Sequence, residues 1–188
     1  MPSKWPDTHI RQEILEFNRE FLELIRADIG PGTAFGLPGA VRQRLALLTP
    51  EQLEAIAATP CLLVTFVAWP PRQLPFGVAE PSCAPAQADA ARLFAAGLLT
   101  WLWHTARQDR LLAALCTGPG RGVVEQLASA GFRDLQRAAA AATAGLEARF
   151  CRHPRLWPDL VRAASQADTQ ILIATRLSAV QLTLISRK

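Results

Sequence analysis

The chain has 188 residues, half of them hydrophobic, and its 20 Lys and Arg against 16 Asp and Glu give a formal net charge of +4. This length suits one ordinary domain or two small ones, and the hydrophobic content excludes wholesale disorder. No run of 18 apolar residues occurs and the N-terminus is charged from the start, so we expect a cytoplasmic protein without a signal peptide or a membrane-spanning segment.

The N-terminal part predicts two helices separated by a break. Apolar residues recur every three or four positions over about 8–28, with glutamates between them, which is typical of an amphipathic helix. The glycines and prolines of "GPGTAFGLPG" (30–39) end this helix. A second helix is predicted over about 40–47.

The stretch "LTPEQLEAIAATPCLLVTF", which follows directly, predicts a capped helix and then a strand. Thr49 and Gln52 have the spacing of a capping box, and Pro50 suits the first helical turn. Pro60 ends the helix, because the residue before a proline is pushed out of the α region. The apolar, partly β-branched run 61–69 predicts an extended strand.

The rest of the chain is predicted to consist of a linker, further helices and a second strand. In chain order these are an extended proline-rich linker at 70–85, a long helix over about 87–115, two helices within 123–144 around Gly131, a strand at "GLEARF" (145–150) and a last helix over about 159–185.

Two sequence patterns occur twice, in the same order. "LLVTFVAWP" (62–70) and "LEARFCRHP" (146–154) share an apolar alternation followed by Phe, three residues and Pro. "QADAARLFAAGLL" (87–99) and "QADTQILIATRLS" (166–178) share Gln-Ala-Asp and three later apolar positions. These matches predict an internal duplication.

The repeat leads to a predicted organisation. We expect a mainly α protein with two helical units in tandem, the first at 1–104, including the linker, and the second, basic one at 105–188. Each unit has one short strand, and the two strands pair across a pseudo-twofold axis that buries both apolar faces in one core.

The segment "LALLTPEQLEAIAATPCLLVTF" (45–66) resembles the flagellar transcriptional activator subunit FlhD. The preceding "AFGL" (34–37) and the closing "DTQILIATRL" (168–177) are also similar to that family. In the main segment the matching positions are Leu45, Ala46, Leu48, Thr49, Gln52, Ala57, Thr59, Leu62 and Phe66.

The FlhD family is a helical, dimeric regulator that acts with a zinc-binding second subunit, FlhC, on flagellar promoters. The resemblance therefore implies a transcription regulator that works through a protein partner, either an FlhC-like subunit or RNA polymerase. A duplicated chain would be a single-chain version of the dimer. This chain departs from the family in its length, its linker, its basic half and at Val64, where members can carry a strand cysteine that bridges the dimer.

The positive charge is concentrated in the second part of the chain and is almost all arginine. Residues 1–67 contain six Lys or Arg against eight Asp or Glu, and residues 68–188 contain fourteen against eight. "VVEQLASAGFRDLQRAAA" has the form of a helix-turn-helix with arginines on its second helix. The candidate contacts to duplex DNA are Arg121, Arg133, Arg137, Arg152 and Arg155. The alternative is an arginine-coated surface that also includes Arg149 and Arg162, with an alanine-rich helix that serves packing.

Candidate contacts to a protein partner or across the dimer are apolar strand residues and tryptophans beside proline-rich turns. They are Leu62, Val64, Phe66, Trp69, Phe150 and Trp157. Buried tryptophans often dominate the energy of an interface. The alternative is that these tryptophans pack the two units against each other.

Catalytic patterns are missing from the sequence. His9, His104 and His153 have no partner at a catalytic spacing, while Asp109 and Asp134 lie among arginines and are expected to be ion-paired. No GxSxG, P-loop or GxGxxG pattern occurs in a suitable setting. We therefore expect a protein that is not an enzyme and needs no cofactor.

The four cysteines are far apart in the sequence. Cys61, Cys83, Cys116 and Cys151 match no zinc-ligand spacing, so we expect free thiols, mostly buried, and no metal site.

Two hypotheses about function stay open. The first is a transcription regulator or co-regulator that acts through a partner, with DNA contact from the arginine-rich second unit. The second is a helical adaptor of a flagellar or type III secretion apparatus without DNA binding. The chain alone, or an oligomer of it, is compatible with both.

Overall fold

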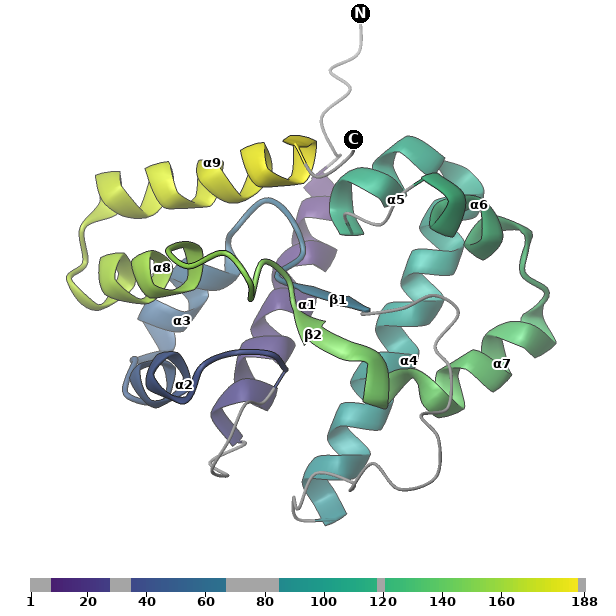
Figure 1. The fold of residues 1–188 in the computed structure, drawn as a ribbon, viewed down its shortest axis with the longest axis horizontal. Coiled ribbons are helices and arrows are strands. Elements are labelled where there is room, and N and C mark those ends of the chain that lie inside the picture. The colour runs from purple at the N-terminus through teal and green to yellow at the C-terminus, as the bar shows by residue number, and fades with distance from the viewer. Residues whose placement is uncertain (1–7, 28–34, 67–84, 118–120, 186–188) are drawn as a thin grey trace, which may run out of the picture.

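The computed structural model describes residues 8–27, 35–66, 85–117 and 121–185, and it is mainly helical with one small sheet (Figure 1). The elements in chain order are α1 (Thr8–Ala27), α2 (Gly39–Ala46), α3 (Pro50–Ala57), β1 (Val64–Phe66), α4 (Pro85–Gln108), α5 (Arg110–Thr117), α6 (Arg121–Ser129), α7 (Phe132–Ala141), a 3-10 turn (Ala142–Gly145), β2 (Leu146–Ala148), α8 (Leu156–Ser165) and α9 (Thr169–Ile185).

The two short strands pair antiparallel at the centre of the fold. Val64 faces Ala148, Thr65 faces Glu147 and Phe66 faces Leu146. The long helices α1 and α4 run past this pair in opposite directions and contact each other (Figure 1). The predicted strands and their pairing are therefore confirmed.

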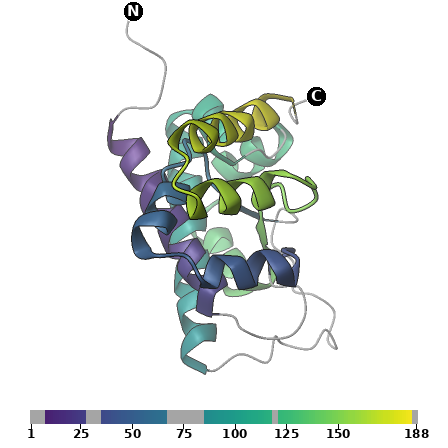
Figure 2. The same cartoon turned by 90° about the vertical axis from the view of Figure 1, so that its left-hand side faces the viewer.

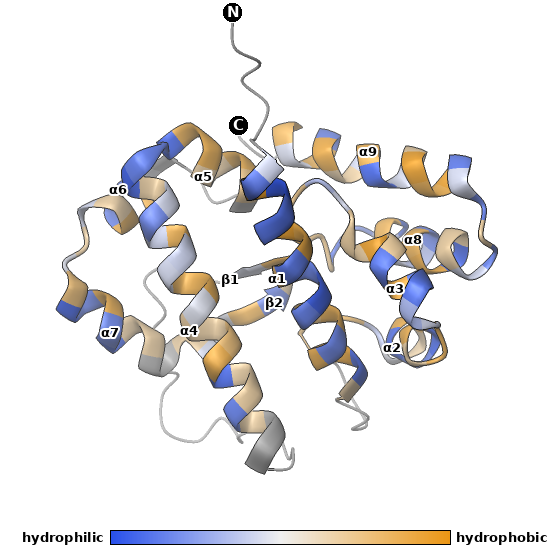
Figure 3. Ribbon diagram, turned by 180° about the vertical axis from the view of Figure 1, so that it is seen from behind, coloured by the Kyte–Doolittle hydropathy of each residue, from blue (hydrophilic) through white to orange (hydrophobic). Residues whose placement is uncertain are grey.

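The other helices flank this centre on two sides. The helices α2, α3, α8 and α9 lie on one side and α5, α6 and α7 on the other, as the views from the front and from behind both show (Figures 1 and 3). Figure 2 shows α9, α8 and α2 stacked one above another on the first side. Buried apolar residues from every helix and strand named above form one core cluster.

The N-terminal helices form as predicted. α1 buries its apolar stripe, with Ile14, Phe21 and Ile25 at most 1% exposed. The capping box of α3 is present: the Gln52 amide N–H donates to the Thr49 hydroxyl, and the Thr49 amide N–H donates to the Gln52 side chain. The local sequence is enough to predict this capping box, because each of its bonds joins residues three positions apart.

The predicted helix at 87–115 is two helices. α4 ends at Gln108, and the Asp109 carboxylate accepts hydrogen bonds from the amides of Leu111 and Leu112 at 2.9 and 3.0 Å. Asp109 thus caps the start of α5, where the sequence interpretation expected an ion pair. Asp134 does pair as expected, with Arg137 at 3.2 Å.

The predicted last helix is also two helices. Ala167, at φ 52°, separates α8 from α9. The amides of Ala167 and Asp168 donate to the carbonyl oxygens of Ala164 and Ala163, which is a Schellman ending of α8. The Asp168 carboxylate then caps α9 by accepting from the Ile171 amide at 3.0 Å. The prediction failed because an alanine in the left-handed region gives no signal in the sequence.

The turn at 35–37, the described part of "AFGL", packs against the second strand. Phe35 and Gly36 have φ values of 52° and 75°, and the Ala148 amide donates to the Phe35 carbonyl oxygen at 2.7 Å. A Cβ on Gly36 would come within 3.0 Å of the Glu147 side chain and 3.1 Å of the Cys151 sulfur. Glycine is therefore required both by the backbone conformation and by the close approach.

The predicted units do not end at a break in the fold. The boundary between 104 and 105 falls inside α4, and the apolar core is continuous across it. The predicted linker, apart from Pro85, lies outside the described residues, as do Trp69 and Cys83.

Candidate functional site

The segment between α3 and β1 is held by a buried asparagine of α1. Asn18 has no exposed surface. Its amide nitrogen donates toward the carbonyl oxygens of Ala57, Thr59 and Cys61 at 3.0, 3.2 and 3.0 Å, and its amide oxygen accepts from the Leu63 amide at 2.8 Å. One neutral side chain therefore satisfies four main-chain groups that would otherwise be buried without partners.

A buried arginine holds the same segment from the other half of the chain. Arg149, which directly follows β2, is 5% exposed. Its guanidinium donates to the carbonyl oxygens of Leu62 and Cys116 at 3.4 and 2.6 Å and to the Thr183 hydroxyl at 2.8 Å. Burial lowers the pKa of Arg149. In the alternative of an exposed arginine coat, Arg149 has to be left out, because it is buried and donates three hydrogen bonds inside the core.

Two thiols accompany Arg149. Cys61 and Cys116 are both 3% exposed, and the Leu62 amide donates to the Cys116 carbonyl oxygen at 3.3 Å, so their main chains are adjacent. Burial raises the pKa of Cys61, and it raises that of Cys116 to about 12, although the Arg149 charge opposes both shifts. Both thiols are therefore protonated at neutral pH, which makes them poor nucleophiles and poor metal ligands. The expectation of free buried thiols is confirmed for these two cysteines.

A small apolar cavity lies beside the two thiols. Its volume is about 30 Å³, roughly the room for one water molecule. Helices α5 and α9 and the segment before β1 line it, through Pro60, Cys61, Leu112, Leu115, Cys116, Val180, Thr183 and Leu184. This space is too small and too apolar for a substrate or cofactor site.

The predicted partner contacts are mostly internal. Leu62, Val64 and Trp157 are 0–1% exposed, so they pack the chain against itself and offer no surface to another molecule. The Trp157 indole N–H donates to the Arg149 carbonyl oxygen at 2.8 Å, a bond within the second predicted unit. Phe66 and Phe150 are half-buried and keep some surface. Trp69 lies outside the described residues.

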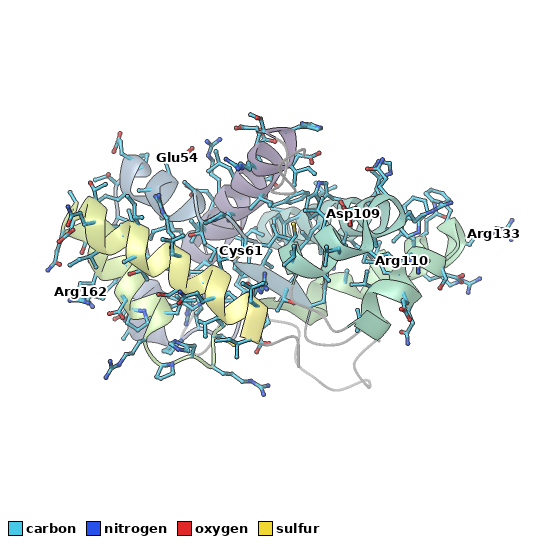
Figure 4. All side chains as sticks on the ribbon, turned by 90° about the horizontal axis from the view of Figure 1, so that it is seen from above. Glu54, Cys61, Asp109, Arg110, Arg133 and Arg162 are labelled. Carbon is cyan, nitrogen blue, oxygen red and sulfur yellow. The ribbon has the colours of Figure 1, made fainter. Side chains whose placement is uncertain are left out.

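The predicted DNA contacts fall into two separate groups. Arg133 and Arg137 are exposed on α7, whereas Arg152 and Arg155 are exposed in the connection from β2 to α8. Because α7 and α8 lie on opposite sides of the strand pair, the four arginines do not form one patch (Figure 1). In the view from above, Arg133 projects from the end of the molecule opposite to Arg162 (Figure 4). Arg121 is the first residue of α6.

The histidines have structural contacts in the described part of the chain. The His153 ring nitrogen Nδ1 accepts from the Leu156 amide at 3.1 Å, at the start of α8. His104 contacts Gln108 one turn along α4, and His9 lies 3.5 Å from Glu13 on α1. Among the described residues, no three His, Cys, Asp or Glu side chains gather in a way that could hold a metal ion.

The sequence reading missed an exposed apolar face on α9. Ile171, Ile173, Leu177, Leu184 and Ile185 are all more than a third exposed. The signal was available in the sequence, because the segment 169–185 has apolar residues on more than one side of the helix and contains one charged residue. Helices of this kind are typically covered on both sides.

Comparisons with known proteins leave the family open. No family model matches the chain, and no curated protein and no solved structure matches it either. The resemblance to FlhD therefore stays a prediction. In the part of the chain that the structure describes, no helix is both long enough and apolar enough to cross a membrane.

Proposed function

We propose that this chain is a non-enzymatic transcription regulator or co-regulator that acts through a protein partner, as a single-chain counterpart of a dimeric FlhD-like regulator. The observation that carries the proposal is the register of the central strand pair. Val64 faces Ala148, and these two residues are counterparts in the sequence repeat. In a twofold arrangement of two copies, equivalent residues meet each other only at the axis.

Two further features support the same arrangement. Val64 is the position at which the resemblance places a cysteine that bridges the dimer, so a twofold axis is expected there. Phe17 of α1 and Trp101 of α4 are separated by as many residues as Val64 and Ala148, and their rings are 5.4 Å apart. The helices that carry them run antiparallel, as equivalent helices do when they cross a perpendicular twofold axis (Figure 1).

The arginines of α7 are better placed for DNA contact than the arginines between β2 and α8. Arg133 and Arg137 are four residues apart, so they project from the same face of α7. Gly131 starts this helix in extended conformation after α6, which gives the two-helix arrangement that the sequence predicted. An exposed pair of arginines on one helical face suits phosphate contact without base reading.

The DNA contact is tested with a matched pair of arginines. Arg137 pairs with Asp134 and Arg92 pairs with Asp89, both at 3.2 Å, at the same spacing and on exposed helical surface. We expect Arg133→Ala combined with Arg137→Ala to weaken binding to duplex DNA about ten-fold near 0.1 M salt and to reduce the salt dependence by about two released counterions. Arg92→Ala should leave both unchanged. Equal binding by all three proteins in fluorescence anisotropy would remove the DNA contact from the proposal.

The partner is tested by affinity purification of the tagged chain from its native cells, with one sample treated with nuclease. Recovery of RNA polymerase or of a zinc-binding regulatory subunit in both samples supports a regulator that acts through protein contact. Recovery that disappears with nuclease supports association through DNA alone. Export or basal-body components without transcription proteins would overturn the regulator.

The second candidate is a helical adaptor of a flagellar or type III secretion apparatus. What favours it is the apolar face of α9, since exposed aliphatic surface suits association with protein better than with DNA. An adaptor predicts partner binding that is insensitive to salt, and no DNA binding by the wild-type chain. The regulator predicts a steep loss of DNA binding with salt.

A further inference from the structure

Helix α9 uses one side to pack against the rest of the fold. Leu172, Ala179 and Thr183 are 6% exposed or less and face the interior, where Thr183 accepts the hydrogen bond from Arg149. Arg176 is the one charged residue between Thr169 and Ile185, and its guanidinium donates to the Ala55 carbonyl oxygen of α3. The charged group of Arg176 therefore also contacts the rest of the fold.

The side of α9 next to α5 has a regular aliphatic stripe. Ile173, Leu177 and Leu184 are 48%, 54% and 51% exposed, and Val180 is half-buried between them. Their spacings of four, three and four residues are those of the apolar seam of a coiled coil. Figure 3 shows apolar residues recurring along the full length of this helix.

The apolar surface continues from α9 onto α5. Val180 and Leu184 line the small cavity from one side, and Leu112 and Leu115 line it from the other. Leu111, the residue before Leu112 on α5, is 53% exposed. The face therefore consists of the α9 stripe together with the neighbouring leucines of α5.

The stripe favours a second copy of this chain as the molecule that covers it. Spacings of four, three and four read the same in both directions, so an identical helix that runs antiparallel matches it: Ile173 meets Leu184, and Leu177 meets Val180. In such a twofold contact, charges close to the axis face their own copies, which is unfavourable for a chain with a net charge of +4. The exposed side of α9 is free of charge, so pairing there avoids this repulsion.

The area of contact requires α5 as well. Seventeen helical residues span about 25 Å, and one helix face of this length covers less than the roughly 800 Å² per partner of a stable interface. The leucines of α5 extend the face in the direction of the cavity. We propose that two copies of this chain associate through an antiparallel α9–α9 contact flanked by α5.

The proposal is tested by sedimentation equilibrium of the full chain over about 1–200 µM, with one variant in the face and one outside it. We expect a concentration-dependent dimer for the wild type and at least about 100-fold weaker association for Leu177→Glu, because the carboxylate would be buried without a partner. Leu93→Glu is the control, since Leu93 is 76% exposed on α4. This variant should dimerise like the wild type.

A charge-swap experiment separates loss of the contact from misfolding. In the antiparallel pair the two Leu177 positions lie close to the axis, so Leu177→Glu and Leu177→Lys should each be monomeric with wild-type circular dichroism. Mixed at equal concentration, they should form a heterodimer that weakens with added salt. A wild-type monomer at 200 µM, a dimer that persists in Leu177→Glu, or no association in the mixture would each overturn the proposal.

The outcome is independent of the proposed function. The arginines of α7 lie on the opposite side of the strand pair from α9 (Figure 1), so Leu177→Glu leaves the DNA-binding surface in place. Loss of dimerisation with unchanged anisotropy would leave the regulator standing.

Discussion

Two buried polar side chains hold residues 57–63 from opposite halves of the chain, and they do so at different cost. Asn18 is neutral and meets four main-chain groups with two donors and one acceptor. Arg149 carries a full charge, and its acceptors within the described structure are two carbonyl oxygens and a hydroxyl, with no carboxylate among them. Desolvation is far more unfavourable for a buried charge with dipoles alone around it than for a buried neutral amide.

The difference shows how the two halves are joined. Asn18 connects α1 to the segment that follows α3, so it acts within the predicted first unit. Arg149 connects β2 to Leu62, to α5 through Cys116 and to α9 through Thr183. The neutral side chain therefore stabilises a local arrangement, while the charged one ties together elements that are far apart in the sequence.

The largest expected effect is that of Asn18→Asp. A carboxylate oxygen would replace the amide nitrogen and face three carbonyl oxygens, so we expect a loss of about 4–5 kcal/mol in the free energy of unfolding at neutral pH. The buried carboxyl would have a raised pKa, so the variant should regain stability as the pH falls below that pKa. Urea unfolding followed by circular dichroism measures both effects.

Gln12→Glu is the control for that substitution. It makes the same amide-to-acid change on the same helix, but Gln12 is exposed and bonds to Glu16 one helical turn away at 2.9 Å. We expect a change below about 0.5 kcal/mol. Equal losses from both substitutions would contradict the role assigned to burial at Asn18.

Arg149→Met is expected to have a smaller effect, about 2–3 kcal/mol. Three hydrogen bonds from a charged donor are lost, but the desolvation of the guanidinium is no longer paid. Arg152→Met, at an exposed position three residues later, should change stability by less than about 0.5 kcal/mol. A loss at Arg149 as large as that of Asn18→Asp would mean that desolvation of this arginine costs little.

Because of the thiols beside Arg149, we expect the free energy of unfolding to fall at alkaline pH. Folding raises the pKa of Cys116 from 9.0 to about 12, so the folded state holds its proton more tightly than the unfolded state does. Stability from this thiol is complete below about pH 9 and is lost as the pH rises toward 12. Near pH 10 the loss from the Cys116 thiol is about 1.4 kcal/mol. Cys116→Ala should reduce the slope of stability against pH, and an unchanged slope would exclude Cys116 as its source.

The buried contacts of Asn18 and Arg149 could not be predicted from the sequence, whereas much of the fold could. The stripe of α1, the capping box of α3 and the two strands follow from patterns a few residues long. Asn18 bonds to residues 39–45 positions away, and Arg149 to residues 33–87 positions away. Such contacts exist only after the fold has formed, and an arginine in a basic sequence looks the same whether it is exposed or buried. The breaks at Asp109 and Ala167 were missed because one cap and one left-handed alanine decide them.

The smallest expected effect, that of Thr49→Ala, isolates what burial adds to a polar contact. The Thr49 hydroxyl accepts one bond from Gln52 at 3.3 Å on exposed surface, where water can replace it. We expect a loss of about 1 kcal/mol in the free energy of unfolding, which is the usual value for a helix N-cap. This loss is well below those expected for the substitutions of Asn18 and Arg149. Thr100→Ala is the matched control: its exposed hydroxyl donates to the Ala96 carbonyl oxygen in the middle of α4, where alanine is the better helix former, so stability should stay equal or rise. A loss at Thr49 that equals the loss in Arg149→Met would contradict the weight given to burial, because Thr49 is exposed and accepts one bond whereas Arg149 is buried and donates three.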